Sequence, residues 1–148
     1  MELRIRRFQE NDYSDLHELL SDGEVMRYIE PPFAPEQTAA FLKRCGLSEP
    51  PLIYAVDDEG GCFIGYIIYH DYGADSRELG WILKRSCWGK GYAQALTRKL
   101  LERALEEGKA LMLECAPEQA VTKHIAEKMG FSYMGRLDGR AIYKYAAP

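Results

Sequence analysis

One stretch of the chain combines residue types and a spacing that could bind a phosphate group. It reads Trp-Gly-Lys-Gly-Tyr-Ala over residues 88–93, between an extended apolar segment and a long amphipathic one. A helix start leaves about four backbone N–H groups without internal partners and carries the positive end of the helix dipole. Gly89 and Gly91 carry no side chain that would block an approaching anion. The stretch therefore predicts either a phosphate cradle or, with similar weight, a simple glycine-rich turn before a helix.

Two other phosphate-binding motifs fit this stretch less well. A P-loop requires G-x-x-x-x-G-K-[ST], and Gly91 follows Lys90, so that motif is absent. A Rossmann fingerprint would use Gly89, Gly91 and an acidic residue such as Glu114. Gln94, however, occupies the third glycine position, where its side chain would hinder close packing of a helix on a strand. A nicotinamide-binding oxidoreductase is therefore a minor alternative.

The elements that must position this stretch alternate between helical and extended patterns. Apolar residues at a 3.6-residue period predict helices, and runs rich in Ile, Tyr and Phe predict strands. The expected order is a strand, two helices, three strands, a helix, a strand, a helix and two strands. The expected ranges are 3–8, 13–20, 36–44, 52–56, 62–70, 78–83, 88–107, 110–115, 117–129, 131–134 and 141–145. This mixed order predicts an α+β fold, partly antiparallel, with a strand–helix–strand crossover in its second half.

Local signals predict how some of these elements begin and end. Asn11 or Asp12 is expected to cap the first helix. Residues 72–77 are expected to form a turn between two strands. Pro117 is expected in the first turn of the last helix, where a missing N–H costs nothing.

The composition excludes several classes of protein. The chain has 148 residues, of which 47% are hydrophobic, and this suits a single domain over residues 1–148. With 19 Lys and Arg against 23 Asp and Glu, the formal net charge is −4, so we expect no nucleic-acid partner. No stretch approaches the roughly 18 apolar residues that span a bilayer, and no signal-peptide pattern opens the chain. We therefore expect a cytoplasmic protein without a membrane partner.

The spacing of cysteine and histidine does not predict a metal site. No C-x-x-C pair occurs, and no histidine lies at ligand spacing from a cysteine. We expect reduced, mostly buried thiols and no metal cofactor. The residues concerned are Cys45, Cys62, Cys87, Cys115, His17, His70 and His124.

In two sequence blocks the chain resembles the GNAT superfamily of N-acetyltransferases, and within it the branch of the ribosomal-protein alanine N-acetyltransferases. The superfamily signature [QR]-x-x-G-x-[GA] is matched in its last half by Gly91-Tyr92-Ala93, and the branch's Trp-Gly-Lys-Gly-Tyr-Ala form is matched from Trp88 onward. A second block, residues 119–131, is similar to N-x-x-S-x-x-x-x-E-K-x-G-F and ends in Glu-Lys-Met-Gly-Phe. The resemblance covers nearly the whole chain.

The resemblance implies a fold and an activity. The fold would be of the acyl-CoA N-acyltransferase type, α/β sandwich-like, with a mixed, mostly antiparallel central sheet of about seven strands and four helices. The activity would be transfer of acetyl from acetyl-CoA to a primary amine, on a protein N-terminus or a small molecule, by direct attack in a ternary complex. The protein would be a monomer or a homodimer.

One departure from the family pattern supports an alternative. Many superfamily members carry a tyrosine four residues before the glycine of Gly-Phe, as the acid that protonates the leaving thiolate, and here that position is Ala126. The alternative is a non-catalytic module that senses acyl-CoA.

The resemblance also implies where acetyl-CoA would bind. Pantetheine would lie like an added strand in an opening between residues 78–83 and 110–115, and the pyrophosphate would meet N–H groups of residues 89–94. Gln119 and Thr122 replace the Asn and Ser of the second block but keep hydrogen-bonding groups. The predicted cofactor-binding residues are Trp81, Ile82, Leu83, Gly89, Lys90, Gly91, Tyr92, Ala93, Gln94, Gln119 and Thr122.

Acetyl transfer to an amine requires a base for the ammonium, donors at the developing oxyanion and an acid for the thiolate. Glu78 and Glu114 are the two candidate bases, since each lies on a strand that would border the opening, and either is equally compatible with a surface role. A main-chain N–H near Leu83 is the natural oxyanion donor. Tyr143 is the candidate acid among several nearby tyrosines.

Overall fold

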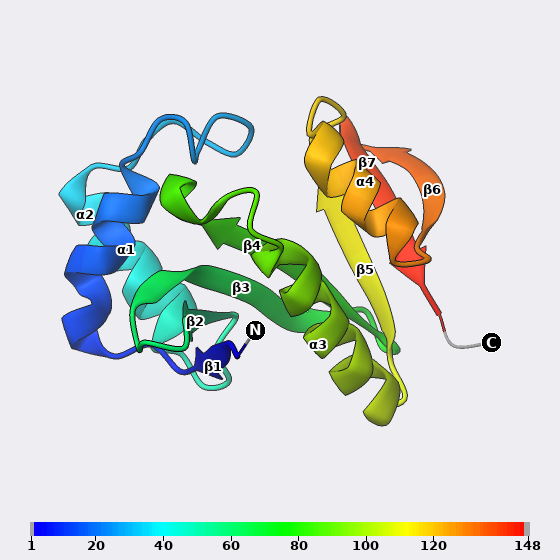
Figure 1. Ribbon diagram of the computed structural model, residues 1–148, viewed down its shortest axis with the longest axis horizontal. Helices are drawn as coiled ribbons and strands as arrows, with labels where there is room; N and C mark the ends of the chain where they lie inside the picture. The colour runs from blue at the N-terminus through cyan, green and yellow to red at the C-terminus, as the bar shows by residue number, and fades with distance from the viewer. Residues whose placement is uncertain (1, 147–148) are drawn as a thin grey trace. The chain divides into compact units, whose positions relative to one another are not determined.

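The computed structural model of the protein describes residues 2–146 and has, within them, seven strands in one sheet of order β1-β2-β3-β4-β5-β7-β6 (Figure 1). β4 pairs with β5 in parallel, whereas β1–β2, β2–β3, β5–β7 and β6–β7 pair antiparallel. The strands are β1 (Arg4–Arg6), β2 (Ile53–Asp57), β3 (Phe63–Tyr72), β4 (Ser76–Leu83), β5 (Ala110–Cys115), β6 (Ser132–Leu137) and β7 (Arg140–Tyr145). This mixed sheet confirms the predicted α+β class.

Four α-helices accompany the sheet in the described residues, as predicted. They are α1 (Tyr13–Leu20), α2 (Pro35–Phe41), α3 (Tyr92–Glu106) and α4 (Ala120–Lys128). Short helical segments η1 (Glu10–Asp12), η2 (Leu42–Gly46) and η3 (Arg85–Cys87) lie between them. Helices and strands follow one another in the predicted order.

Several predicted boundaries are wrong by a few residues. The helix expected from residue 88 begins at Tyr92, because Gly89 and Gly91 adopt left-handed φ angles of +73° and +84°, which a helix does not tolerate. The helix expected from residue 117 begins at Ala120. The turn expected over residues 72–77 is confined to residues 73–75, since β3 runs to Tyr72 and β4 starts at Ser76.

Asp12, one of the two residues predicted to cap the first helix, is the N-cap residue of α1 by position. Asp12 makes no side-chain cap to α1. Its Oδ2 instead accepts a hydrogen bond from the Gln9 N–H at 2.7 Å, and its carboxylate pairs with Arg6. Arg6 also pairs with Asp57, at 2.8 Å, and both aspartates are buried. The guanidinium between them compensates two carboxylates that would otherwise face each other away from water.

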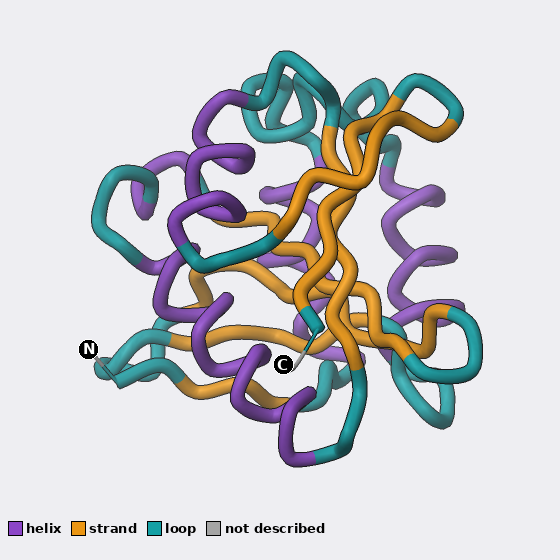
Figure 2. Tube along the Cα trace, turned by 90° about the vertical axis from the view of Figure 1, so that its right-hand side faces the viewer, coloured by secondary structure: helices purple, strands orange, loops and turns teal. Residues whose placement is uncertain are grey.

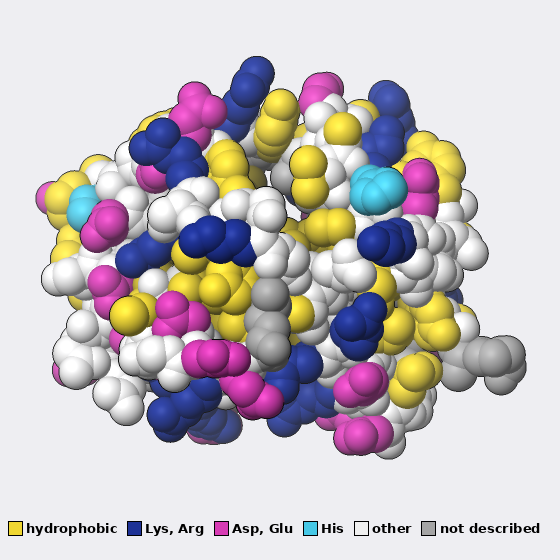
Figure 3. Space-filling model, in the orientation of Figure 1, with side chains coloured by type: hydrophobic (Ala, Val, Ile, Leu, Met, Phe, Trp, Pro, Cys, Tyr) yellow, Lys and Arg dark blue, Asp and Glu magenta, His cyan; other side chains and the backbone are white. Residues whose placement is uncertain are grey.

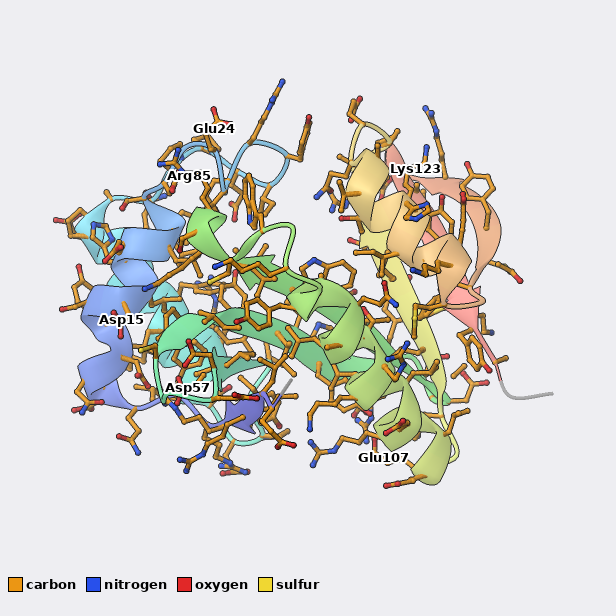
Figure 4. The ribbon with its side chains drawn as sticks, in the orientation of Figure 1. Asp15, Glu24, Asp57, Arg85, Glu107 and Lys123 are labelled. Carbon is orange, nitrogen blue, oxygen red and sulfur yellow. The ribbon has the colours of Figure 1, made fainter. Side chains whose placement is uncertain are left out.

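Among the described residues, 2–68 and 81–90 form one compact unit, here called unit 1. Its core gathers residues of α1 spaced for one helix face, Leu16, Leu19 and Leu20, against apolar residues of β2 and β3. α1 and α2 lie side by side in this unit (Figure 1). Arg85 of η3, labelled in Figure 4, pairs with Asp22 after α1 at 2.8 Å and so ties the segment that follows β4 to the rest of this unit.

Gly65 allows an unusually close backbone approach in unit 1. Its φ is +150°, and a Cβ placed on it would lie 2.1 Å from the carbonyl oxygen of Ile82. The N–H of Lys84 donates to the carbonyl of Ile64 at 2.9 Å, beside this contact. Only glycine leaves room for β3 to lie this close to the end of β4.

Among the described residues, 69–80 and 91–146 form the other unit, here called unit 2. β5 buries alternate residues, Leu111, Leu113 and Cys115, on the face that α3 and α4 cover (Figure 2). At the end of α3, Glu107, labelled in Figure 4, accepts hydrogen bonds from the Tyr69 hydroxyl and from Arg77. The opposite face of β5 is only half-buried and carries its polar residue.

The surface drawn in Figure 3 shows Lys and Arg side chains interspersed with Asp and Glu side chains. Among the helices of residues 2–146, none has the length and apolar character needed to span a bilayer.

Candidate active site

The N-terminus of α3 presents free backbone donors. Gly91 is the N-cap and has no side chain, so no side-chain oxygen caps the helix. Its carbonyl accepts the first helical hydrogen bond, from the Ala95 N–H at 3.1 Å. The N–H groups of the first helical turn have no acceptor within the helix, because the intrahelical bonds begin with the Ala95 N–H. These donors and the helix dipole favour an anion at this point.

The end of β4 lies beyond its registered pairing with β5. The pairs run from Ser76 with Ala110 to Leu79 with Leu113, and β4 continues to Leu83. One of the main-chain groups predicted to bind acetyl-CoA is already occupied, however, because the indole Nε1–H of Trp88 donates to the Leu83 carbonyl at 2.9 Å. The N–H of Leu83 remains the candidate donor, as predicted for the oxyanion.

Glu78 and Glu114 line one small pocket in unit 2, together with Tyr72, Met112, Leu113 and Ile142. The strand register explains this. Glu78 of β4 pairs with Met112 of β5, and Glu114 follows two residues later on the same face. Glu114 in turn pairs with Ile142 of β7. The structure thus brings both candidate bases together.

The two carboxylates have different surroundings. Burial raises the pKa of Glu78, and the negative charge of Glu114 raises it further, while His70 and Arg140 oppose the rise. The Glu78 side chain is 20% exposed and that of Glu114 is 35% exposed. Arg140 Nε lies 3.4 Å from Glu114 Oε1. Glu114 therefore has a cationic partner, whereas Glu78 favours its proton more strongly than a free glutamate does.

Sequence reasoning missed His70, Tyr72 and Arg140 around these carboxylates. His70 Nε2 lies 3.8 Å from Glu78 Oε2, and Tyr72 lines the pocket. The sequence held a signal for two of them. His70 and Tyr72 are two residues apart on one strand and so share a face, and a three-residue turn leads from that strand directly into β4. The prediction of a long turn from residue 72 hid it.

Tyr143, the predicted acid, does not share this pocket. It lies on β7 opposite Leu113 and is 1% exposed. Neighbouring residues on a strand point to opposite faces, so Tyr143 lies on the other face of the sheet from Ile142 and Glu114. Burial raises the pKa of Tyr143, with smaller contributions from Glu127 and Cys115. The structure therefore does not bring it near Glu78.

The second block, residues 119–131, forms α4 together with its N-cap Gln119 and the residues that follow the helix. Gln119 Oε1 accepts a hydrogen bond from the Ala116 N–H at 2.8 Å, which leaves its amide N–H groups as the available donors. Thr122 is half-buried on the first turn of α4. Lys123, labelled in Figure 4, donates to the Pro117 carbonyl at 3.3 Å. Ala126 is fully buried, so this position has no side chain that reaches solvent or a ligand.

In the part of the chain that the structure describes, no group of three or more His, Cys, Asp or Glu residues is arranged to hold a metal ion.

Comparison with known proteins gives the family. Residues 2–132 match the family model described as an acetyltransferase (GNAT) domain. The chain is 31% identical over 140 residues to an uncharacterized N-acetyltransferase, YnaD, of Bacillus subtilis, and the match spans 90% of this chain and 81% of that protein. The chain therefore belongs to the GNAT family and is an acetyltransferase. Neither match singles out the ribosomal-protein alanine branch, which stays a prediction.

Solved structures show the same fold. An acetyltransferase (GNAT family) from Bacillus anthracis is similar with a TM-score of 0.85 at 25% identity, over 99% of this chain and 95% of that one. A spermidine N-acetyltransferase from Vibrio cholerae, solved in complex with CoA and spermine, has a TM-score of 0.79 at 20% identity, over 96% and 92% of the two chains. The second likeness concerns the fold alone.

Proposed function

We propose that this protein transfers the acetyl group of acetyl-CoA to a primary amine, on a protein N-terminus or a small molecule, by direct attack in a ternary complex. The observation that carries the proposal is that Glu78 and Glu114 lie together on one face of β4 and β5, within a GNAT fold. An amine attacks a thioester only as the neutral base, so the site must remove a proton from an ammonium. A buried carboxylate with a raised pKa suits that task near neutral pH.

The free donors at the start of α3 support binding of acetyl-CoA. The N–H groups of residues 91–94 would bind its pyrophosphate, with Gly89 leaving the approach open and Lys90, which is exposed, near the same charge. Main-chain groups of Trp81, Ile82 and Leu83 would bind the pantetheine arm, apart from the occupied Leu83 carbonyl. Gln119 and Thr122 remain candidate contacts from α4. When bound, acetyl-CoA supplies the activated acetyl group.

Between the two candidate bases, we assign the proton-accepting role to Glu78. Its environment raises its pKa, and it has no cation in direct contact apart from His70 when that ring is protonated. Glu114, by contrast, lies against the guanidinium of Arg140, with Nε 3.4 Å from Oε1. The Leu83 N–H is the proposed donor to the oxyanion, and the acid for the thiolate is not assigned to any residue.

Release of free CoA thiol in the presence of different amines tests the proposal. We expect release with at least one class among peptides, polyamines and aminoglycosides. Glu78→Gln should lower the amine-dependent rate by about 100-fold or more at neutral pH, in line with the loss of a general base. The loss should shrink as pH rises, since more of the amine is then already neutral. A wild-type protein that binds acetyl-CoA but acetylates no amine would contradict the proposal.

A further inference from the structure

The ring of His70 is held in one tautomer by its neighbour in the chain. Its Nδ1 lies 2.8 Å from the carbonyl oxygen of Asp71. A carbonyl oxygen only accepts hydrogen bonds, so Nδ1 must carry the hydrogen. In the neutral ring the other nitrogen, Nε2, is therefore unprotonated and has a free lone pair. The main chain of Asp71 thus orients the ring and decides which nitrogen acts as an acceptor.

That acceptor nitrogen faces the proposed base. His70 Nε2 lies 3.8 Å from Glu78 Oε2, a separation longer than a direct hydrogen bond that a small side-chain rotation would close. Two unprotonated acceptors that face each other gain nothing, whereas a proton on either one makes the contact favourable. The geometry therefore favours one proton shared by the pair. His70 is the more exposed partner, at 27% against 20% for Glu78, so the ring lies on the solvent side.

We propose that His70 is a positioning residue for acetyl transfer, which takes from Glu78 the proton that leaves the acceptor ammonium and passes it to solvent. This inference rests on the proposed function. The ammonium N–H bond breaks and a proton joins a Glu78 carboxylate oxygen. That proton then moves to His70 Nε2, which restores the carboxylate and forms an imidazolium whose Nδ1–H stays on the Asp71 carbonyl. Loss of the Nε2 proton to water returns the neutral ring.

Charged groups face the His70–Glu78 pair from several strands. Glu78 faces the ring from β4, and Glu114 adds a second negative charge from β5. Arg140, from β7, lies against Glu114 rather than against the ring. On β3 itself, the Asp71 carboxylate pairs with Arg77. The Glu78 carboxylate is thus the charged group in direct reach of the His70 ring, while Glu114 and Asp71 each have an arginine partner.

Kinetics of His70→Gln test the relay. We expect kcat/KM for the amine to fall about tenfold at neutral pH, less than the 100- to 10,000-fold of a direct acid–base group, with KM for acetyl-CoA unchanged. The defect should shrink as pH approaches the pKa of the amine, because the proton no longer has to be removed. A purely structural role for His70 predicts a loss of the same size at every pH, which would overturn the inference. So would unchanged kinetics.

Two controls keep the result interpretable. His124→Gln changes an exposed histidine of α4 and should leave the kinetics unchanged. A long-range 1H–15N NMR spectrum of the intact wild-type protein reads the tautomer directly, even if His70→Gln folds poorly. A hydrogen on Nδ1 of His70 supports the inference, and a neutral ring with its hydrogen on Nε2 overturns it. A wild type inactive towards every amine contradicts the proposed function, whereas an active wild type with an unaffected His70→Gln contradicts the relay alone.

Discussion

Glu78 and Glu114 have the same side chain but differ in what surrounds them. Glu78 is the more buried and faces His70, whereas Glu114 is the more exposed and lies against Arg140. The charge on each neighbour changes how strongly Glu78 holds a proton: Glu114 raises its pKa and Arg140 lowers it. Residue chemistry alone therefore does not separate the two glutamates, and their neighbours do.

Neutralising either neighbour should move the pH profile in a predictable direction. If Glu78 is the base, the acidic limb of kcat/KM for the amine follows its pKa, since the carboxylate must be ionised to accept a proton. Glu114→Gln removes a negative charge, lowers the pKa of Glu78 and should move the limb to lower pH. Arg140→Gln removes a positive charge, raises that pKa and should move the limb to higher pH.

Arg136→Gln is the matched control, because Arg136 is exposed on β6 and its register partner, Ala141, lies on the other face of β7 from Ile142. Its profile should coincide with that of the wild type. If Glu114→Gln and Arg140→Gln moved the limb in the same direction, Glu78 would not be the group that the profile reports.

At the scale of elements, two glycines permit backbone arrangements that other residues would not: the uncapped start of α3 and the close approach of β3 to β4. Gly91 begins α3 with a left-handed φ of +84° and leaves the next N–H groups uncapped. Gly65 lets β3 lie directly against the main chain of β4. Both positions depend on backbone geometry, so any side chain introduced there by substitution would disturb the local structure.

Gly91→Glu should weaken acetyl-CoA binding by about 100-fold or more, which is about 2.7 kcal/mol, because bulk and negative charge would lie beside the diphosphate. Isothermal calorimetry measures this. Gly108→Glu is the control at the other end of the same helix, since Gly108 has a similar φ of +70° and open space around it. It carries the same backbone strain and should leave affinity unchanged. Equal affinity of Gly91→Glu and wild type would argue against the proposed cradle.

Gly65→Ala should destabilise the protein by about 3 kcal/mol, because its methyl group would lie 2.1 Å from the Ile82 carbonyl oxygen and main chain must move to relieve the clash. Urea unfolding gives the change in the free energy of unfolding. Gly60→Ala is the matched control, since the nearest atom to its Cβ is the Asp58 Oδ1 at 3.4 Å, an ordinary contact. Similar stabilities for the two variants would mean that the close approach at Gly65 carries no cost.

At the scale of the whole molecule, a ligand that binds only the folded chain stabilises all of it. Acetyl-CoA at about 100 times its Kd should add about 2.7 kcal/mol to the free energy of unfolding. For a chain of this length that corresponds to a rise in Tm of about 5 to 10 °C. Thermal unfolding with increasing acetyl-CoA measures the shift. NAD is the control ligand, and a rise with NAD but not with acetyl-CoA would contradict the proposed binding.

Much of the fold was predictable from short-range sequence patterns. The 3.6-residue period of α3 and the apolar runs of the strands predicted the element order, and the glycines at 89 and 91 predicted an open helix start. The helix limits were less accurate. Side-chain periodicity alone would start α3 at residue 88, but the left-handed glycines at 89 and 91 delay its start to Tyr92. The family resemblance rested on two short blocks and was confirmed by the match over residues 2–132.

The amino-acid sequence by itself determined the elements, the uncapped start of α3 and the two candidate bases, because these depend on periodicity, backbone freedom and residue type within a few positions. Only the tertiary structure decided that Glu78 and Glu114 share a pocket with Tyr72, near His70 and Arg140, and that Tyr143 lies on the other face of the sheet. Those outcomes depend on the register between strands far apart in the chain. A shift of one residue in that register would move every side chain of the shifted strand to the opposite face of the sheet. The register is set by the packing of the whole sheet and not by a local sequence pattern.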